Sequence, residues 1–283
     1  MKKLTQIIVL IVLFLGCSIL SNSQTIKVMT YNIRYDNPDD GLNAWSKRKD
    51  YFCTQLKFYA PDIFGVQEGL EHQLKYIDSS LVCYNYVGVG RDDGQKKGEH
   101  SAIFYNTKKF KLIKQSTFWL SETPDVVSKG WDAALNRVCT YALLECKNTK
   151  QQFWVFNTHL DYLGELSRNN SAKLIIARIK SLNKTNNPVF LMGDFNSEPT
   201  TDAVKYISET LNNSKQVCQG IVFGPDGSFN GFEFDKPVVK LLDYVFTDKK
   251  RIRVDKYAVL SDSKDCRYPS DHLPVYVEMT FLK

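Results

Sequence analysis

Two short acidic motifs, far apart in the sequence, carry side chains suited to phosphoester chemistry. They are Gly193-Asp194-Phe195-Asn196 and Ser270-Asp271-His272, and each adjoins an apolar, strand-like run. A carboxylate beside an imidazole can hold a cation and a phosphate oxygen at the same time. Together the two motifs indicate metal-assisted hydrolysis of a phosphoester.

The first motif offers groups that can handle the attacking water. If the strand before it continues, Asp194 and Asn196 point to the same side, and Gly193 leaves room for a ligand to approach the backbone. Phosphoester hydrolysis needs an activated water and positive character around the phosphoryl group. We predict that Asp194 orients or deprotonates this water and that Asn196 holds water or phosphate.

Two histidines are candidates for binding the phosphate. We predict that His159 and His272 donate hydrogen bonds to phosphate oxygens, most effectively when protonated. Asp161 follows two residues after His159 and is predicted either to act in catalysis or only to orient that histidine. Arg137 lies in a loop of the kind that rims such sites, and a structural role is favoured for it.

A second group of oxygen donors predicts a metal site. Glu68 and Asp271 would repel one another if the fold brought them together, and a hard divalent cation is the usual remedy. Asn32 can add its amide oxygen, and Mg²⁺ or Mn²⁺ suits such an all-oxygen site. Zinc fits less well because no Cys/His cluster has its usual spacing. We therefore expect a Mg²⁺ site, with Mn²⁺ as the alternative.

These side chains follow a recurring unit, an apolar run that ends in one or two polar residues. Runs of this length are strands, predicted at residues 26–32, 63–68, 102–106, 153–159, 189–196, 241–246 and 273–279. Helices are predicted at residues 45–59, 71–78, 167–182 and 202–211. Helices spread along the chain between strands predict an α/β protein with helices on the outer faces of packed sheets.

The N-terminus has the layout of a secretory signal. Lys2 and Lys3 precede an apolar stretch at residues 4–15 and then small polar residues. We expect residues 1–23 to be removed on export and residues 24–283 to form one domain, with a lipoprotein anchored at Cys17 as the alternative. Cleavage would lower the formal charge from +6 to +4, because only Lys2 and Lys3 are lost. That mild excess is far from the basic stripe of a dedicated nucleic-acid binder.

The motifs occur in an order that resembles the endonuclease/exonuclease/phosphatase superfamily. They are Met29-Thr30-Tyr31-Asn32-Ile33-Arg34, Val66-Gln67-Glu68-Gly69, Asn157-Thr158-His159-Leu160-Asp161, Gly193-Asp194-Phe195-Asn196, Leu242-Asp243-Tyr244-Val245 and Ser270-Asp271-His272-Leu273-Pro274-Val275. The resemblance implies a DNase-like, four-layer α/β/β/α sandwich with the active site at one end of the two sheets. It assigns Asn32, Glu68 and Asp271 to the metal site and implies that Asp243 pairs with His272. Many similar sequences carry a further histidine where this chain has Tyr162, which leaves the substrate preference open.

The expected function is hydrolysis of a phosphomonoester or phosphodiester by an exported, Mg²⁺-dependent enzyme. A small phosphorylated substrate of unknown identity is favoured, and no obligate protein partner is implied. Nucleic acid would need an extended basic groove with stacking aromatics, and phospholipid would need an exposed apolar loop, for which Trp119, Trp131 and Phe232 are candidates. The rival from another class is a module on the same fold that binds a phosphorylated ligand without turning it over.

Overall fold

The computed structural model describes residues 25–282. The predicted signal peptide at residues 1–23 and the alternative anchor at Cys17 lie outside this part of the chain. Within it, no helix is both long and apolar enough to cross a membrane.

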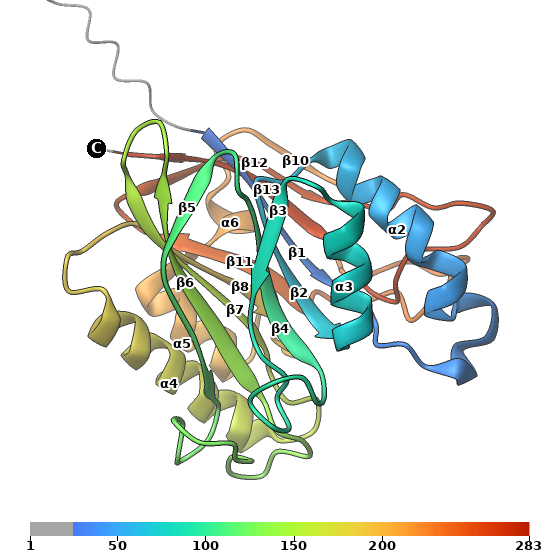
Figure 1. The fold of residues 1–283 in the computed structure, drawn as a ribbon, viewed down its shortest axis with the longest axis horizontal. Helices are drawn as coiled ribbons and strands as arrows, with labels where there is room; N and C mark the ends of the chain where they lie inside the picture. The colour runs from blue at the N-terminus through green and yellow to red at the C-terminus, as the bar shows by residue number, and fades with distance from the viewer. Residues whose placement is uncertain (1–24, 283) are drawn as a thin grey trace, which may run out of the picture.

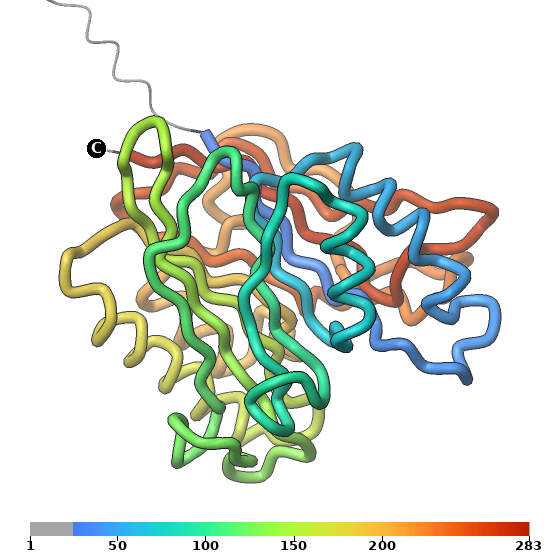
Figure 2. The backbone as a smooth tube through the Cα atoms, in the orientation of Figure 1, coloured from blue at the N-terminus to red at the C-terminus, as the bar shows by residue number. Residues whose placement is uncertain are grey.

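The first of two mixed sheets contains seven strands. They are β1 (Thr25–Asn32), β2 (Ile63–Gly69), β3 (Tyr84–Val87), β4 (His100–Asn106), β10 (Ile221–Phe223), β12 (Ile252–Val259) and β13 (Val275–Phe281). Their order across the sheet is β10-β12-β13-β1-β2-β4-β3. The first strand pairs in parallel with β2 and antiparallel with β13, so the two ends of the described chain run side by side (Figure 2).

The second sheet contains six strands. They are β5 (Phe110–Trp119), β6 (Val138–Cys146), β7 (Gln152–His159), β8 (Val189–Asp194), β9 (Leu211–Asn213) and β11 (Asp243–Asp248). Their order is β5-β6-β7-β8-β11-β9. The parallel pair of β7 and β8 lies at the centre, and the crossover between them contains a long helix.

The helices cover the outer faces of both sheets (Figure 1). They are η1 (Pro38–Asn43), α2 (Trp45–Tyr59), α3 (Glu71–Ser80), α4 (Glu165–Leu182), α5 (Asp202–Thr210) and α6 (Ser214–Val217). Apolar side chains of α2 and α3 pack on the first sheet, and those of α4 and α5 pack on the second. A third apolar cluster fills the space between the sheets. The predicted four-layer α/β/β/α sandwich is confirmed.

One buried amide joins the two sheets. Asn157 on β7 donates hydrogen bonds to the carbonyls of Val66 (2.9 Å) and Ala102 (2.8 Å), which belong to the first sheet. Its Oδ1 accepts from Nε2 of Gln67 at 2.6 Å. Gly65 lies against this amide, and a Cβ there would approach Oδ1 to 2.6 Å. These bonds fix the position of one sheet relative to the other.

Candidate active site

Strand register brings three predicted residues together at one end of the second sheet. His159 ends β7, Asp194 ends β8 and Asp243 begins β11, and the pairing places the other two on either side of Asp194. From the first sheet, Asn32 ends β1 and Glu68 is the penultimate residue of β2. Asp271 and His272 lie in the loop before β13. We call this end of the sandwich the catalytic end.

A cavity of about 440 Å³ opens at the catalytic end. Its lining includes six of the nine predicted site residues, namely Glu68, His159, Asp194, Asn196, Asp271 and His272. The other seven lining residues are Arg34, Tyr35, Glu99, Leu135, Arg137, Tyr162 and Phe229. Asn32, Asp161 and Asp243 are fully buried behind the lining.

Asp194 lies at the centre of the polar cluster and is almost completely buried. Its Oδ2 accepts a hydrogen bond from Nδ2 of Asn32 at 2.9 Å and lies 3.5 Å from Nε2 of His159 and 3.7 Å from Nε2 of His272. Burial, together with the nearby Asp243 carboxylate, raises the pKa of Asp194 to about 7. A carboxylate with such a pKa is suited to accept a proton near neutral pH.

His272 is held by the partner that the family resemblance implied. Its Nδ1 lies 2.8 Å from Oδ2 of Asp243, which also accepts a hydrogen bond from the Ser228 hydroxyl at 2.6 Å. Burial alone would lower the pKa of His272, but the carboxylates of Asp243 and Asp194 outweigh it and hold this pKa well above its usual range. The two carboxylates thus favour the charged form of His272, whose Nε2 lies 3.7 Å from Oδ2 of Asp194.

His159 differs from the prediction that it acts best when protonated. Burial and the nearby cations of Arg137 and Arg91 hold the pKa of His159 well below its usual range, so the ring is neutral. The Asn196 amide donates to Nε2 of His159 and to the carbonyl of Leu160, both at 3.0 Å. Both of its N–H groups are thus used to hold the loop and the imidazole, and its Oδ1 is left to accept from water.

The expected geometry of the first motif is also wrong. β8 ends at Asp194, and Asn196 adopts a left-handed backbone with φ of 44°. The turn is closed by a hydrogen bond of 2.8 Å from the Asn196 N–H to Oδ1 of Asp194. Gly193 is required for strand packing rather than for a ligand, because a Cβ there would lie 2.1 Å from the carbonyl oxygen of Thr158 on β7.

Asp161 does not orient His159. Its carboxylate accepts N–H groups from Ala134, Leu135, Leu163 and Gly164 and the Nε–H of Arg137 at 3.2 Å. Burial alone would raise the pKa of Asp161. These donors outweigh burial, lower the pKa below its usual value and keep the carboxylate charged. Asp161 is therefore a positioning residue for Arg137 and for the two loops beside it.

Arg137 is a site residue that we assigned a structural role from sequence. Its guanidinium is buried and lines the cavity, yet Nη1 has no hydrogen-bond partner among the described residues. A buried cationic donor without a partner is costly unless a ligand satisfies it. The Arg137 guanidinium is thus suited to bind an anionic group of a ligand.

The two acids predicted to hold the metal both lie at the catalytic end, and their role as metal ligands stays a prediction. Glu68 and Asp271 both line the cavity, and burial together with Glu68 raises the pKa of Asp271, against the opposing effect of His272. Two acids that disfavour each other's charge fit a divalent cation. Glu68 has a left-handed φ of 61°, a strained conformation of the kind that occurs at functional sites.

Asn32 does not offer its amide oxygen to that site. Oδ1 accepts the backbone N–H of Arg34 at 3.0 Å, while Nδ2 donates to Glu68 (3.0 Å) and to Asp194 (2.9 Å). The orientation follows from the carboxylates on both sides, which need a donor between them. Asn32 therefore lies between Asp194 and Glu68 and is hydrogen-bonded to both carboxylates.

A second grouping, Asp194 with Asp243 and His272, also has ligand atoms within 4.8 Å of one another. Within this grouping, Nδ1 of His272 is bonded to Asp243, and Oδ2 of Asp194 accepts a hydrogen bond from Asn32. Glu68 and Asp271 remain the predicted metal ligands, and this grouping is the alternative that the geometry offers.

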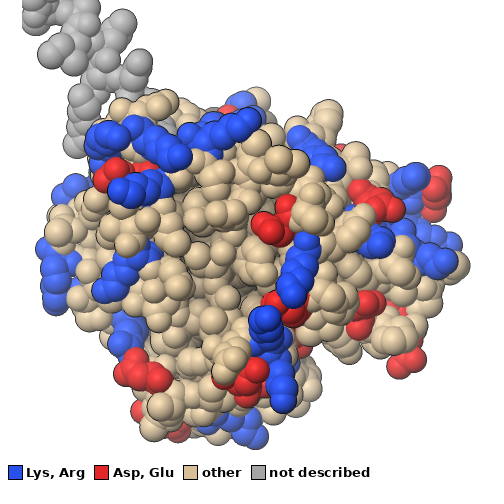
Figure 3. Space-filling model, in the orientation of Figure 1, with Lys and Arg blue, Asp and Glu red and all other residues tan. Residues whose placement is uncertain are grey.

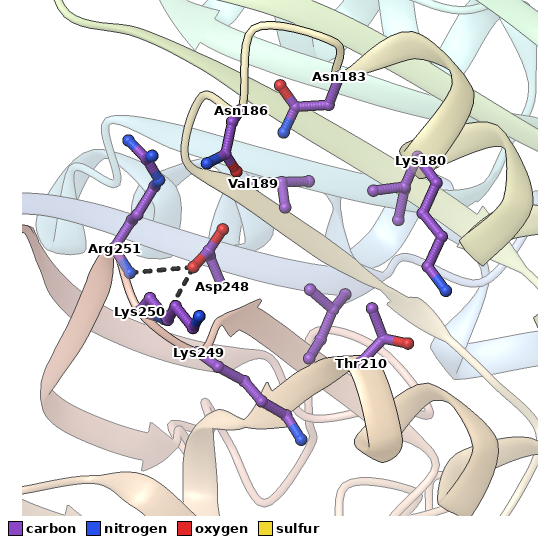
Figure 4. A pocket seen from close by; sticks show the side chains of 11 residues that line it. Lys180, Asn183, Asn186, Val189, Thr210, Asp248, Lys249, Lys250 and Arg251 are labelled. Atoms are coloured by element: carbon purple, nitrogen blue, oxygen red, sulfur yellow. Dashed lines mark hydrogen bonds between the residues drawn. The ribbon is translucent and has the colours of Figure 1, made fainter.

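A larger cavity of about 630 Å³ lies near the opposite end of β8 and is called the distal cavity (Figure 4). Val189, the first residue of β8, contributes to its lining, as do the basic residues Lys180, Lys249, Lys250 and Arg251. Its one acid among the described residues is Asp248, whose Oδ1 accepts the N–H groups of Lys250 and Arg251. It has no buried acid and no histidine in its described lining.

Fold and site together define a class, the four-layer sandwich proteins with an acid-rich cavity at the strand ends. The Endonuclease/Exonuclease/phosphatase family matches residues 29–272, and the chain belongs to this family. Its members are hydrolases that act on phosphoester bonds, typically with a divalent metal ion.

Two similar proteins with known structures come from a bacterium. An endonuclease/exonuclease/phosphatase family protein from Bacteroides thetaiotaomicron is 38% identical, with 93% of this chain and 100% of that chain covered and a TM-score of 0.89. A mannosyl-6-phosphatase from the same organism is 39% identical, with 90% and 99% covered and a TM-score of 0.86. Among curated sequences, nocturnin from Mus musculus is 23% identical over 92% of this chain and 67% of that protein.

Proposed function

We propose that the protein is a Mg²⁺-dependent phosphomonoesterase that acts on a small phosphorylated substrate, with sugar phosphates as the preferred class. The observation that carries this proposal is the buried Arg137 guanidinium, whose Nη1 has no partner among the described residues and whose side chain lines the same cavity as Asp194 and His272. A volume of about 440 Å³ suits a small molecule. Similarity to the mannosyl-6-phosphatase supports the choice of a sugar phosphate.

In this proposal each side chain has a distinct task. Arg137 and His272 donate hydrogen bonds to the phosphoryl oxygens and stabilise the charge that develops on them. Asp194 accepts a proton from the attacking water, whose oxygen forms the new bond to phosphorus as the ester oxygen leaves with the P–O electron pair. Glu68 and Asp271 would hold a divalent cation, which supplies further positive charge beside the phosphoryl group.

A nucleic-acid substrate is less well supported by the surface. On the face shown in Figure 3, basic side chains lie along the upper and left margins and in a short row right of centre, and acidic side chains lie beside that row. Lys109 is paired with Asp62 at 2.5 Å. Trp119 is buried and donates its indole N–H to the carbonyl of Arg91 at 2.7 Å, so it is not available to stack a base. These features do not form the basic groove with stacking aromatics that nucleic acid requires.

We also propose that the protein is exported, on the basis of the signal-like residues 1–23. Fractionation of expressing cells, with mass spectrometry of the mature N-terminus, tests this. Gln24 as the first residue supports a cleaved signal, a lipid-modified Cys17 supports the anchored alternative, and an intact Met1 contradicts export.

The catalytic proposal is tested by a substrate panel with added Mg²⁺. Inorganic phosphate is measured from hexose 6-phosphates, and the same enzyme is offered a phosphodiester, RNA and sphingomyelin vesicles. We expect the highest kcat/KM for a hexose 6-phosphate. Preference for RNA or for vesicles would move the protein to another activity within the family, and binding without turnover of any substrate would favour the non-catalytic module.

A further inference from the structure

We propose that Tyr162 and Leu135 form the subsite that binds the sugar ring attached to the phosphate; this inference rests on the proposed function. Both residues line the catalytic cavity, yet Tyr162 is 54% and Leu135 is 41% exposed. They therefore present an apolar surface at the mouth of a cavity whose interior is charged. Such a surface suits the part of a substrate that carries no charge.

The two residues are held in place by the buried carboxylate of Asp161. Its Oδ2 accepts the N–H of Leu135 at 3.4 Å, and its Oδ1 accepts the N–H of Leu163, directly after Tyr162, at 3.1 Å. One side chain thus fixes two loops that are distant in sequence. The surface is organised before a ligand arrives, which reduces the entropy lost on binding.

The subsite lies beside the group that marks the phosphate position. Cζ of Arg137 lies 5.9 Å from the centre of the Tyr162 ring, within the range of a cation–π contact. Asp161 also accepts the Nε–H of Arg137, so the same carboxylate holds the guanidinium and the backbone directly after Tyr162. A phosphate bound by Arg137 would therefore place its ester-linked group next to Tyr162.

The chemistry of this surface favours a sugar over a lipid chain. A tyrosine ring has an apolar face and a polar hydroxyl, and it can contact both the C–H groups and the hydroxyls of a sugar. Leu163 and Leu166 extend the exposed apolar surface, but neither lines the cavity. The described lining also contains the rings of Tyr35 and Phe229, and Phe229 packs against His272, whereas Tyr162 lies next to Arg137.

Leu166 provides a matched control for Tyr162, because it is also 54% exposed and lies outside the cavity. The experiment compares Tyr162→Ala, Tyr162→Phe and Leu166→Ala on mannose 6-phosphate and on methyl phosphate, which has no ring. Loss of the ring should raise KM for mannose 6-phosphate about tenfold and leave kcat within about twofold, because uniform binding is lost. Tyr162→Phe should raise KM for mannose 6-phosphate less than Tyr162→Ala does, because only the hydroxyl contact is lost. Leu166→Ala should resemble the parent, and no variant should change KM for methyl phosphate.

The subsite is contradicted if the KM of Tyr162→Ala for mannose 6-phosphate equals that of the parent. It is also contradicted if KM for methyl phosphate rises by the same factor. Titration calorimetry with mannose 6-phosphate and inorganic phosphate separates this failure from failure of the proposed function. The parent could be inactive yet bind the sugar phosphate more tightly than phosphate, with this difference in affinity lost in Tyr162→Ala. That result would support the subsite and contradict the proposed phosphatase activity. Weaker binding of Leu166→Ala to phosphatidylcholine vesicles, with sugar binding unaffected by Tyr162→Ala, would assign the surface to a membrane instead.

Discussion

The two ends of strand β8 differ in the kind of charge that they present. At the distal cavity the charges belong mostly to exposed lysines, and the Asp248 carboxylate is satisfied by backbone N–H groups. At the catalytic end, about 20 Å away along the six residues of β8, acids, histidines and Arg137 are buried against one another. The larger cavity is thus the one whose described lining has no cluster of buried ionisable side chains.

The comparison teaches that desolvation, rather than cavity size, identifies the reactive end. Burying charged groups is unfavourable unless they are paired, so a cluster with an unpartnered Arg137 Nη1 is not explained by packing. The same burial raises the pKa of Asp194 and lowers that of His159. The exposed lysines at the distal cavity have no buried, unpaired charged groups beside them among the described lining residues.

The largest effect should come from removing the metal or one of its ligands. Exhaustive chelation, or Glu68→Gln, should abolish phosphate release, because positive charge beside the phosphoryl group is lost. Added Mg²⁺ or Mn²⁺ should restore phosphate release by the chelated parent but not by the Glu68→Gln variant. Full activity after chelation would contradict the assignment of a metal ion to the catalytic end.

Replacement of the histidine partner should have the next largest effect. Asp243→Asn leaves His272 without the carboxylate that orients and charges it, and kcat/KM should fall about 10- to 100-fold. Circular dichroism and the melting temperature check that the variant folds. A folded variant with the parent's kcat/KM would show that the pair does not support catalysis.

The pH dependence provides a third test of the buried acid. Because burial raises the pKa of Asp194 to about 7 and a base must be deprotonated to act, activity should rise as the pH increases towards 7. Below that pKa the expected slope of log kcat/KM is about one per pH unit. Activity that is constant from pH 5 to pH 8 would rule out Asp194 as the base.

The smallest effect is expected at the distal cavity. The double substitution of Lys250 and Arg251 by alanine should leave kcat/KM for a sugar phosphate within about twofold, since surface charges at this distance are screened. A large loss would break the contrast between the two ends and indicate that the distal cavity binds substrate.

The central part of the fold could be predicted from the sequence. All seven predicted strands are the adjacent central ones, β13-β1-β2-β4 in one sheet and β7-β8-β11 in the other. Buried on both faces, they form continuous apolar runs. The six strands that were not predicted lie outside them, and in β5 and β12 exposed charged residues interrupt the apolar pattern.

Site residues could be predicted where the residue type and its motif indicate a chemical role. They were harder to predict where the role depends on burial in the folded structure. Glu68, Asp194 and His272 were identified by their types and motifs. The neutral state of His159 depends on Arg137 and Arg91, which approach it from other parts of the chain. The task of Asp161 depends on backbone donors from two loops, and no sequence pattern specifies that arrangement.

The claim that the catalytic end hydrolyses phosphoesters is tested most directly by one paired measurement. Phosphate release from mannose 6-phosphate is followed for the parent and for Asp194→Asn at saturating Mg²⁺, with phosphate binding measured by calorimetry. We expect turnover by the parent and a loss of kcat of at least about 100-fold in the variant, with phosphate binding retained. Equal turnover by the two proteins would contradict the assignment of Asp194 and the mechanism built on it.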